Sequence, residues 1–185
     1  MKDNPKILIY APSIVSSGGR ALIEALISLK EPQLIFYLSE ALKQNSLYNY
    51  FYCKKGLLNR LKAEIELYKI SKDYDLVLMF GNNPPLLKLK CRTFVFIQNK
   101  NIFSQGISHF IQRAFHKFLK KNYQIIIVQT AHMKDIVSQY FPNKPIKINS
   151  FLPRFSSLNR EKKELRIKYD FIYVATGVKS KNHKR

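Results

Sequence analysis

This sequence has no tryptophan, few acidic residues, and no apolar run approaching the length of a membrane-spanning helix. Its 185 residues include 12 Asp and Glu against 32 Lys and Arg, a formal net charge of +20. Such a surface attracts polyanions, namely nucleic acid, anionic lipid headgroups or phosphorylated substrates, and charge alone does not choose among them. We expect no membrane-spanning helix. We also expect no signal peptide, because the apolar stretch 7–10 is short and is soon interrupted by Pro12.

Residues that bind metals or form disulfides are also sparse. Cys53 and Cys91 are far apart and show neither C-x-x-C nor zinc-ligand spacing, so a reduced, cytoplasmic chain is the simple expectation. The histidines likewise show no metal-ligand spacing, and we expect no bound metal. They are His109, His116, His132 and His183.

Recognisable catalytic and nucleotide-binding signatures are missing too. No Ser-His-Asp set, H-E-x-x-H, G-x-G-x-x-G or G-K-[ST] can be found. No RNA-recognition or helix-turn-helix signature occurs either, which disfavours nucleic acid as a partner. Asp73-Tyr-Asp75 matches the D-x-D pattern that chelates metal in another class of sugar transferase. It precedes a predicted strand, opposite the expected site, so we interpret it as the solvated start of that strand.

Apolar runs of strand length alternate with amphipathic stretches of helix length. Continuous apolar strands separated by helices indicate strands buried on both faces, and so a Rossmann-like, doubly wound parallel α/β sheet. The segment 39–56 is polar and tyrosine-rich, and we predict a short helix and a loop there. Strands are predicted over 6–10, 33–38, 75–80, 93–97, 124–128 and 144–149, and helices over 21–29, 57–70, 106–121 and 131–140.

Composition divides the chain into three predicted parts. Residues 1–152 form the Rossmann-like domain, and the polar, charged segment 153–168 is typical of a linker. Residues 169–185 begin with a new apolar strand that ends in a polar loop. We interpret them as the first strand and loop of a second, truncated domain.

Helix 106–121 has two faces of different character. At about 100° per residue, one face is apolar and the other carries His109, Arg113, His116, Lys117 and Lys120. The second face is either simply solvated or rests on anionic lipid. In the latter case Arg113, Lys117 and Lys120 are the membrane-facing candidates.

Polar residues gather where the predicted strands end, which is where open parallel sheets bind ligands. The segment 16–20 joins the first strand to the first helix, and its glycines allow a phosphate or a sugar hydroxyl to approach backbone N–H groups. An ordinary tight turn explains the same residues equally well.

The order of these parts resembles bacterial family 4 (group 1) glycosyltransferases over nearly the whole chain. The Lys-Asn pair after the late strand is the most telling match. The matching segments are SSGGR at 16–20, FGNNPP at 80–85, VFIQN at 95–99, VQTAHM at 128–133, FIYV at 171–174 and KNH at 181–183.

This resemblance implies a GT-B fold, in which two Rossmann-like domains face a cleft. The N-terminal domain holds a glycan or lipid-linked acceptor and the C-terminal one a nucleotide-sugar; transfer retains anomeric configuration and needs no metal. It also implies that the enzyme works in surface polysaccharide or lipopolysaccharide synthesis. By the same resemblance Gly18, Gly19 and Lys181 lie near the donor phosphates, where Lys181 neutralises the leaving diphosphate. Asn82, Gln98 and Asn99 face the acceptor.

The sequence departs from the family pattern in two places. Ala175 stands where an Arg commonly precedes the Lys by six positions, and the donor-binding E-x-seven-E segment would lie beyond Arg185. We therefore expect a fragment that does not transfer sugar alone. The alternative is a non-catalytic basic α/β module that binds an anionic glycan, a lipid or nucleic acid.

Overall fold

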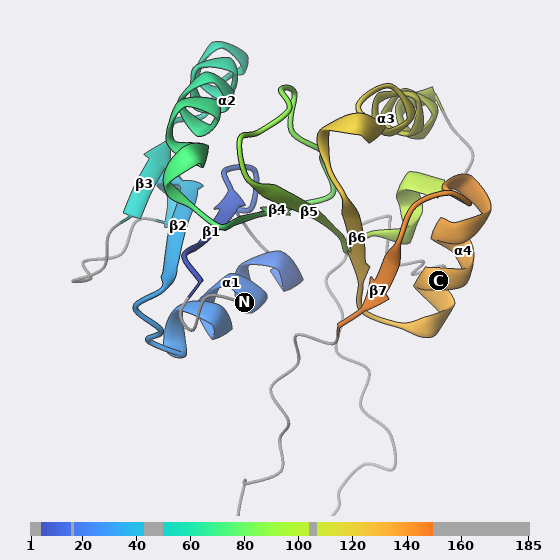
Figure 1. Ribbon diagram of the computed structural model, residues 1–185, viewed down its shortest axis with the longest axis horizontal. Helices are drawn as coiled ribbons and strands as arrows, with labels where there is room; N and C mark the ends of the chain where they lie inside the picture. Colours follow the sequence, from blue (N-terminus) through green and yellow to red (C-terminus); the bar gives the residue numbers. More distant parts are fainter. Residues whose placement is uncertain (1–4, 16, 43–49, 104–106, 150–185) are drawn as a thin grey trace, which may run out of the picture. The chain divides into compact units, whose positions relative to one another are not determined.

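A parallel β-sheet forms the centre of the protein in the computed structural model, which describes residues 5–15, 17–42, 50–103 and 107–149. Within those ranges seven strands follow the order β3-β2-β1-β4-β5-β6-β7, and every neighbouring pair is parallel (Figure 1). The Rossmann-like α/β fold expected from the sequence is confirmed. The strands are β1 (Ile7–Ala11), β2 (Leu34–Ser39), β3 (Tyr50–Cys53), β4 (Leu76–Phe80), β5 (Arg92–Ile97), β6 (Ile125–Val128) and β7 (Ile146–Ile148).

The central strands are apolar because both of their faces are covered. Along β1, Leu8 and Tyr10 join the core on one face, and Ile9 and Ala11 join the core on the other. All four side chains are at most 2% exposed. Neighbouring strands lie in register, with Ile9 opposite Phe36, so each face presents a continuous apolar layer.

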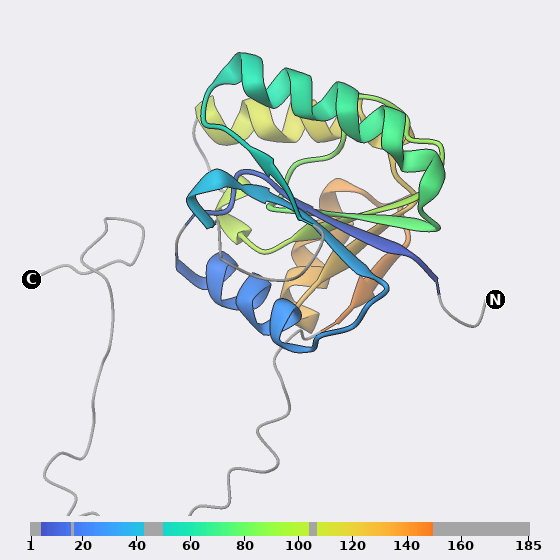
Figure 2. The ribbon, with the colours of Figure 1, turned by 90° about the vertical axis from the view of Figure 1, so that its left-hand side faces the viewer.

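Helices cover both faces of the sheet. α1 packs on one face through Ile23, whereas α2 through Leu67 and α4 through Val137 join the opposite core. α3 lies on the same side as α2 (Figures 1 and 2). This division follows from right-handed crossovers that leave β1 in one direction and β3, β5 and β6 in the other. The helices are α1 (Ser17–Ser28), α2 (Leu57–Ile70), α3 (Ile107–Phe118) and α4 (Ala131–Tyr140), with short 3₁₀ turns at Glu40–Leu42, Ser71–Asp73, Lys100–Phe103 and Lys120–Asn122.

Two elements differ from the sequence-based prediction. β3 lies inside 39–56, which we expected to contain only a short helix and a loop. It is an edge strand that pairs only with β2 in the described sheet, and its aromatic residues are half-buried. α1 begins at Ser17, four residues earlier than expected. The linker 153–168, the late strand 171–174 and Lys181 lie outside the described residues.

Among the described residues, no helix is both long and apolar enough to cross a bilayer.

Truncation of a core residue on α2 provides a test of this packing. Leu67 is fully buried, so Leu67→Ala removes apolar contacts and leaves a cavity, and we expect it to lower the free energy of unfolding by about 2–5 kcal/mol. Leu58→Ala on the same helix is the matched control, because Leu58 is 73% exposed; its effect should stay within about 0.5 kcal/mol. Urea unfolding checks both values, and equal losses would contradict the orientation of α2.

Candidate functional site

The carboxyl ends of β1 and β4 mark the point where the chain's crossovers change direction. β1 leads to β2 on one side, whereas β4 leads to β5 on the other. At such a switch point the loops after the two strands part and leave a crevice, which is where open α/β sheets bind ligands. The candidate site is therefore built from the segments after β1 to β5.

A pocket of about 1060 Å³ opens at this edge of the sheet. It offers hydroxyls, cations and apolar surface together, a combination that suits a sugar bearing a phosphate or a lipid. Burial raises the pKa of the Cys53 thiol, which disfavours the nucleophilic thiolate. The pocket is lined by Pro12, Ser13, Val15, Ser39, Glu40, Ala41, Cys53, Lys54, Lys55, Gly56, Leu57, Arg60 and Asn83.

Arg60 on α2 is the best-fixed cation of the pocket. Its Nη2 lies 3.2 Å from Oε1 of Glu64, one helical turn later. Its Nη1 donates to Oγ of Ser13 at 3.3 Å, and its guanidinium lies 5.0 Å from the ring centre of Tyr10. Three contacts thus hold the guanidinium at the loop after β1, where its remaining N–H groups can meet an anion or a sugar hydroxyl.

Glu64 is a buried carboxylate, only 3% exposed. Burial raises the pKa of this carboxyl, and the charge of Arg60 and the N–H of Leu86 oppose that shift. Leu86 N donates to Oε2 at 3.2 Å. Glu64 therefore positions Arg60 and also ties α2 to the segment that follows β4.

Asn82 occupies the centre of the turn after β4. Gly81 and Asn82 have φ angles of 116° and 71°, a region that glycine and asparagine tolerate better than other residues. This sharp turn lets Oδ1 of Asn82 accept from the backbone N–H groups of Gln98 at 2.6 Å and Asn99 at 3.2 Å. The structure therefore brings the three expected acceptor-side residues together. The side-chain oxygen of Asn82 is already occupied by hydrogen bonds from the backbone of the other two.

Gln98 lies against the first turn of α1. A Cβ placed on Gly19 would be 3.4 Å from Oε1 of Gln98 and 3.0 Å from Cδ1 of Ile14, whereas one on Gly18 would meet nothing within 4 Å. The first turn of a helix leaves backbone N–H groups without helical partners. The position of Gly18 thus leaves open space at the first turn of α1. The lack of a side chain at Gly19 lets this turn lie close to Gln98.

His116 anchors α3 beneath this turn and is 1% exposed. Its Nε2 lies 2.6 Å from the carbonyl oxygen of Asn82, which can only accept, so Nε2 carries the proton. Burial lowers the pKa of His116, which favours the neutral ring. The ring also packs edge-on against Tyr123 and beside Phe141.

The prediction that one polar face of α3 is solvated is wrong for His116 and Arg113, and His109 is half-buried as well. His116 is buried, and Arg113 turns toward its own domain, where Nη1 donates to the carbonyl of Ile102 at 3.0 Å. Lys117 and Lys120 are exposed at the end of the helix. The expected apolar face instead points outward, because the buried hydrogen bond of His116 determines which side of α3 meets the sheet.

No group of three or more potential metal ligands occurs among the described residues. The D-x-D pair lies at the opposite edge of the sheet from the pocket. Asp73 ends a 3₁₀ turn before β4, and Oδ2 of Asp75 accepts from the N–H of Lys6 at 3.0 Å. These positions agree with a role at the start of the strand.

Sequence reasoning missed Arg60 and Glu64, and it did not single out Ser13. Arg60 and Glu64 are spaced i,i+4 on a helix, which is also the pattern of an ordinary surface ion pair. Only the fold shows that this pair is turned toward the pocket. The polar loop after the first strand was a weak signal for Ser13.

The burial of the Arg60–Glu64 pair can be measured against an exposed pair of the same spacing. Arg60→Ala leaves a buried carboxylate without its cation, and we expect a loss of about 2–3 kcal/mol in unfolding free energy near pH 8. Because the pKa of Glu64 is raised, the loss should shrink as the pH falls and the carboxyl takes up a proton.

Arg20→Ala is the control for this pair. Arg20 and Glu24 are also i,i+4, at 2.7 Å, but their side chains are 49% and 42% exposed. That substitution should cost less than about 1 kcal/mol. Urea unfolding at several pH values checks both, and similar, pH-independent costs would show that Glu64 is not a buried charge.

His116 should make folding stability depend on pH. Its pKa is lowered in the folded state, so the unfolded chain binds the extra proton first as the pH falls below about 6.5. We expect the unfolding free energy to be highest above that pH and to decrease below it. His116→Gln keeps an N–H donor for Asn82 and should flatten this decrease, whereas His132→Gln, at an exposed position on α4, should not. Thermal unfolding from pH 5 to 8 decides, and parallel curves for the wild type and His116→Gln would refute the assignment.

Comparisons with known proteins identify a solved structure with a similar fold. No protein-family model matches the chain, and no curated protein matches its sequence. Among solved structures, the crystal structure of Anabaena Alr3699/HepE in complex with UDP and glucose is similar, with a TM-score of 0.53 at 9% identity. The match covers 73% of this chain but 41% of that protein, so the chain spans less than half the length of its structural relative. At this identity the likeness concerns the fold.

Proposed function

We propose that this chain is the acceptor-side half of a two-domain GT-B glycosyltransferase that moves a sugar from a nucleotide-sugar to a glycan or lipid-linked acceptor. The observation that carries the proposal is the similarity of its fold to a protein solved with UDP and glucose. These two molecules are the nucleotide and the sugar of a UDP-glucose donor. The resemblance to family 4 glycosyltransferases in motif order supports the same function and, with it, a role in surface polysaccharide synthesis.

The pocket at the switch point has the chemistry that such an acceptor needs. Ser13 and Ser39 supply hydroxyl groups for sugar hydroxyls, and Arg60, Lys54 and Lys55 supply positive charge for a phosphate. A glycan linked to lipid through a diphosphate carries both kinds of group. We assign this pocket to the acceptor, beside the cluster of Asn82, Gln98 and Asn99.

The first turn of α1 suits the donor side of the same site. Its backbone N–H groups lie at the positive end of the helix dipole, which favours phosphate. Gly18 adds open space there. We propose that Gly18 and Gly19 approach the donor diphosphate and that Lys181 supplies a neutralising cation, so that transfer proceeds with retention and without a metal ion.

Sugar transfer by this proposal needs a donor-side domain as well. The chain spans 41% of its structural relative, and the E-x-seven-E segment of the resembled family has no counterpart in its sequence. We propose that it is a cytoplasmic fragment, inactive until a donor-side domain accompanies it.

The first test is a transfer assay on the 185-residue chain with radiolabelled UDP-glucose and membrane lipid extract. We expect no labelled product, because the proposal assigns most of the donor site to a domain outside these 185 residues. Detectable transfer by the pure chain would refute its status as an inactive fragment. The nucleotide sequence after the codon for Arg185, translated in all frames, gives an independent check, since a helix and an E-x-seven-E segment should follow.

The acceptor assignment is tested by binding. A disaccharide linked to a short polyprenyl diphosphate should shift amide resonances around Ser13, Ser39 and Gly56 in the described domain. Lys54→Ala with Lys55→Ala should weaken this binding about tenfold, because two phosphate-neutralising cations are removed. Lys134→Ala, at an exposed position on α4 outside the pocket, is the control.

A different outcome would favour the alternative function. Steeply salt-dependent binding of RNA or DNA, with no response to the sugar ligand, would identify a non-catalytic basic module.

A further inference from the structure

Exposed apolar side chains concentrate on one side of the sheet. Of the twelve large hydrophobic residues that are exposed in the described part of the chain, nine lie on α2, on α3 or in the segment that joins β4 to β5. That segment rises between the two helices, which lie on the same side of the sheet (Figure 1). Scattered exposed hydrophobics need no explanation, but a concentration of this kind marks an interaction surface. The nine are Leu57, Leu58, Leu61, Ile65, Leu87, Phe110, Ile111, Phe115 and Phe118.

α3 contributes the most exposed aromatic residues. Phe118 is 84% exposed, Phe110 64% and Ile111 60%. At about 100° per residue they lie opposite His116, which is held by Asn82 on the sheet side. The apolar face of α3 therefore points away from the protein. A solvated helix has the opposite arrangement.

α2 presents a similar outward stripe. Leu58 and Ile65, 73% and 50% exposed, share its outer face with Lys62 and Lys69. The inner face of the same helix carries the buried Leu67. Lysine stems can extend along an apolar interface while their charged ends reach anionic groups.

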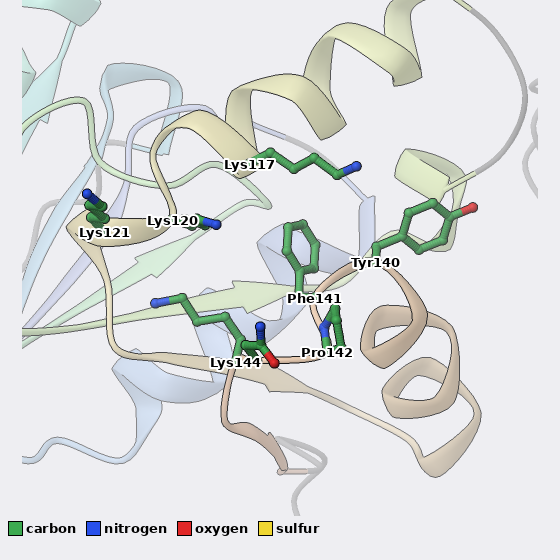
Figure 3. Close-up of a pocket in the computed structure, with 8 residues that line it drawn as sticks. Lys117, Lys120, Lys121, Tyr140, Phe141, Pro142 and Lys144 are labelled. Atoms are coloured by element: carbon green, nitrogen blue, oxygen red, sulfur yellow. The ribbon is translucent and has the colours of Figure 1, made fainter.

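Lysines also surround the end of α3. Lys117, Lys120, Lys121 and Lys144 line a pocket of about 430 Å³ next to Tyr140 and Phe141, and no acidic residue lines it (Figure 3). Burial, and then the charge of Lys120, lower the pKa of Lys144. The Lys144 ammonium donates to the carbonyl oxygen of Tyr123. The clustered positive charges of this pocket suit a phosphate, and Phe118, which follows Lys117 in the chain, is exposed.

We propose that the outer faces of α2 and α3, with this lysine pocket, form a surface that docks on a bilayer of anionic phospholipid. Phenylalanine and leucine side chains enter the boundary between headgroups and acyl chains, and the lysines bind headgroup phosphates. The docking rests on these exposed residues and not on sugar transfer. It also moves the membrane contact from Arg113, which turns inward, to the apolar residues around it.

Charge complementarity selects the bilayer among the candidate occupants. A second copy of the chain would bring the same lysines against each other in a two-fold symmetric interface. Residues 154–185 of the chain contain ten Lys and Arg against three Asp and Glu, so that segment is cationic as well. An anionic lipid surface complements both the charge and the apolar character.

The experiment is co-sedimentation of the 185-residue chain with vesicles of phosphatidylglycerol and phosphatidylcholine in equal parts, compared with phosphatidylcholine alone. We expect binding to the anionic vesicles that weakens with salt, and much weaker binding to the neutral ones. Phe110→Ser with Phe118→Ser should reduce the partition coefficient at least about tenfold, because two aromatic side chains that would enter the bilayer are lost. Both residues are exposed, so the fold should be retained, which circular dichroism checks.

Matched controls separate this surface from general stickiness and charge. Leu29→Ser changes a residue that is 58% exposed after α1, the helix on the opposite face of the sheet, and should leave binding unchanged. Lys117→Glu with Lys121→Glu should reduce binding to anionic vesicles at least about tenfold. Lys147→Glu, at an exposed position on β7, should have a much smaller effect.

Three results would overturn the proposal. One is equal binding by the wild type and the Phe110→Ser/Phe118→Ser variant. Another is an equal loss of binding in the Leu29→Ser control. The third is a dimer in light scattering that the double phenylalanine variant abolishes, since that would make the surface a protein interface. No sugar enters these measurements, so their failure would leave the proposed glycosyl transfer untouched.

Discussion

One residue, Asn82, connects three elements of the described domain. Its left-handed backbone turns the chain away from β4, its side-chain oxygen accepts from the N–H groups of Gln98 and Asn99, and its carbonyl accepts from His116 on α3. Its own N–H donates to the carbonyl of Phe96 at 3.3 Å. The N–H of Gln98 is half-buried and the ring of His116 is buried, and leaving such polar groups without a partner is costly. The loops at the carboxyl ends of β4 and β5, and the helix that follows, therefore take their positions from a single turn.

The rotation of α3 is a consequence of that turn. The buried His116, which donates to the carbonyl of Asn82, brings one side of the helix against Tyr123 and Phe141. The opposite side, which carries Phe110 and Phe118, has to face outward. Apolar periodicity alone favours the reverse orientation, since it assigns the apolar side to the core. The packing of this domain gives no reason for an apolar side on the outside of α3. An external partner that covers this side gives one.

Much of the fold follows from the sequence, because its strongest signals are apolar runs and their spacing. α2 and α4 have the bounds predicted from periodicity, and the parallel sheet follows from strands such as β6 that are apolar throughout. β3 could not be predicted in the same way, since it is a short edge strand whose tyrosines are half-buried. In the candidate site, the sequence indicated the polar residues at strand ends, whose roles stay predictions, but it did not indicate Arg60 and Glu64. Their role depends on which way α2 faces, and periodicity does not distinguish a pair turned toward a pocket from a pair in solvent.

α2 links the candidate pocket to the proposed membrane surface. Arg60 lies on its inner side at the pocket, whereas Leu58 and Leu61 are on its outer side. The two are separated by the thickness of one helix, about 10 Å. α2 begins at the carboxyl edge of the sheet, where the pocket opens. If the outer face of α2 rests on the bilayer as proposed, the mouth of the pocket lies beside the headgroup layer. A sugar joined to a lipid through a diphosphate could then reach Arg60 while its hydrocarbon chain stays in the bilayer. One side of α2 would thus recognise the proposed acceptor, and the other side would hold the protein at the membrane that contains this acceptor.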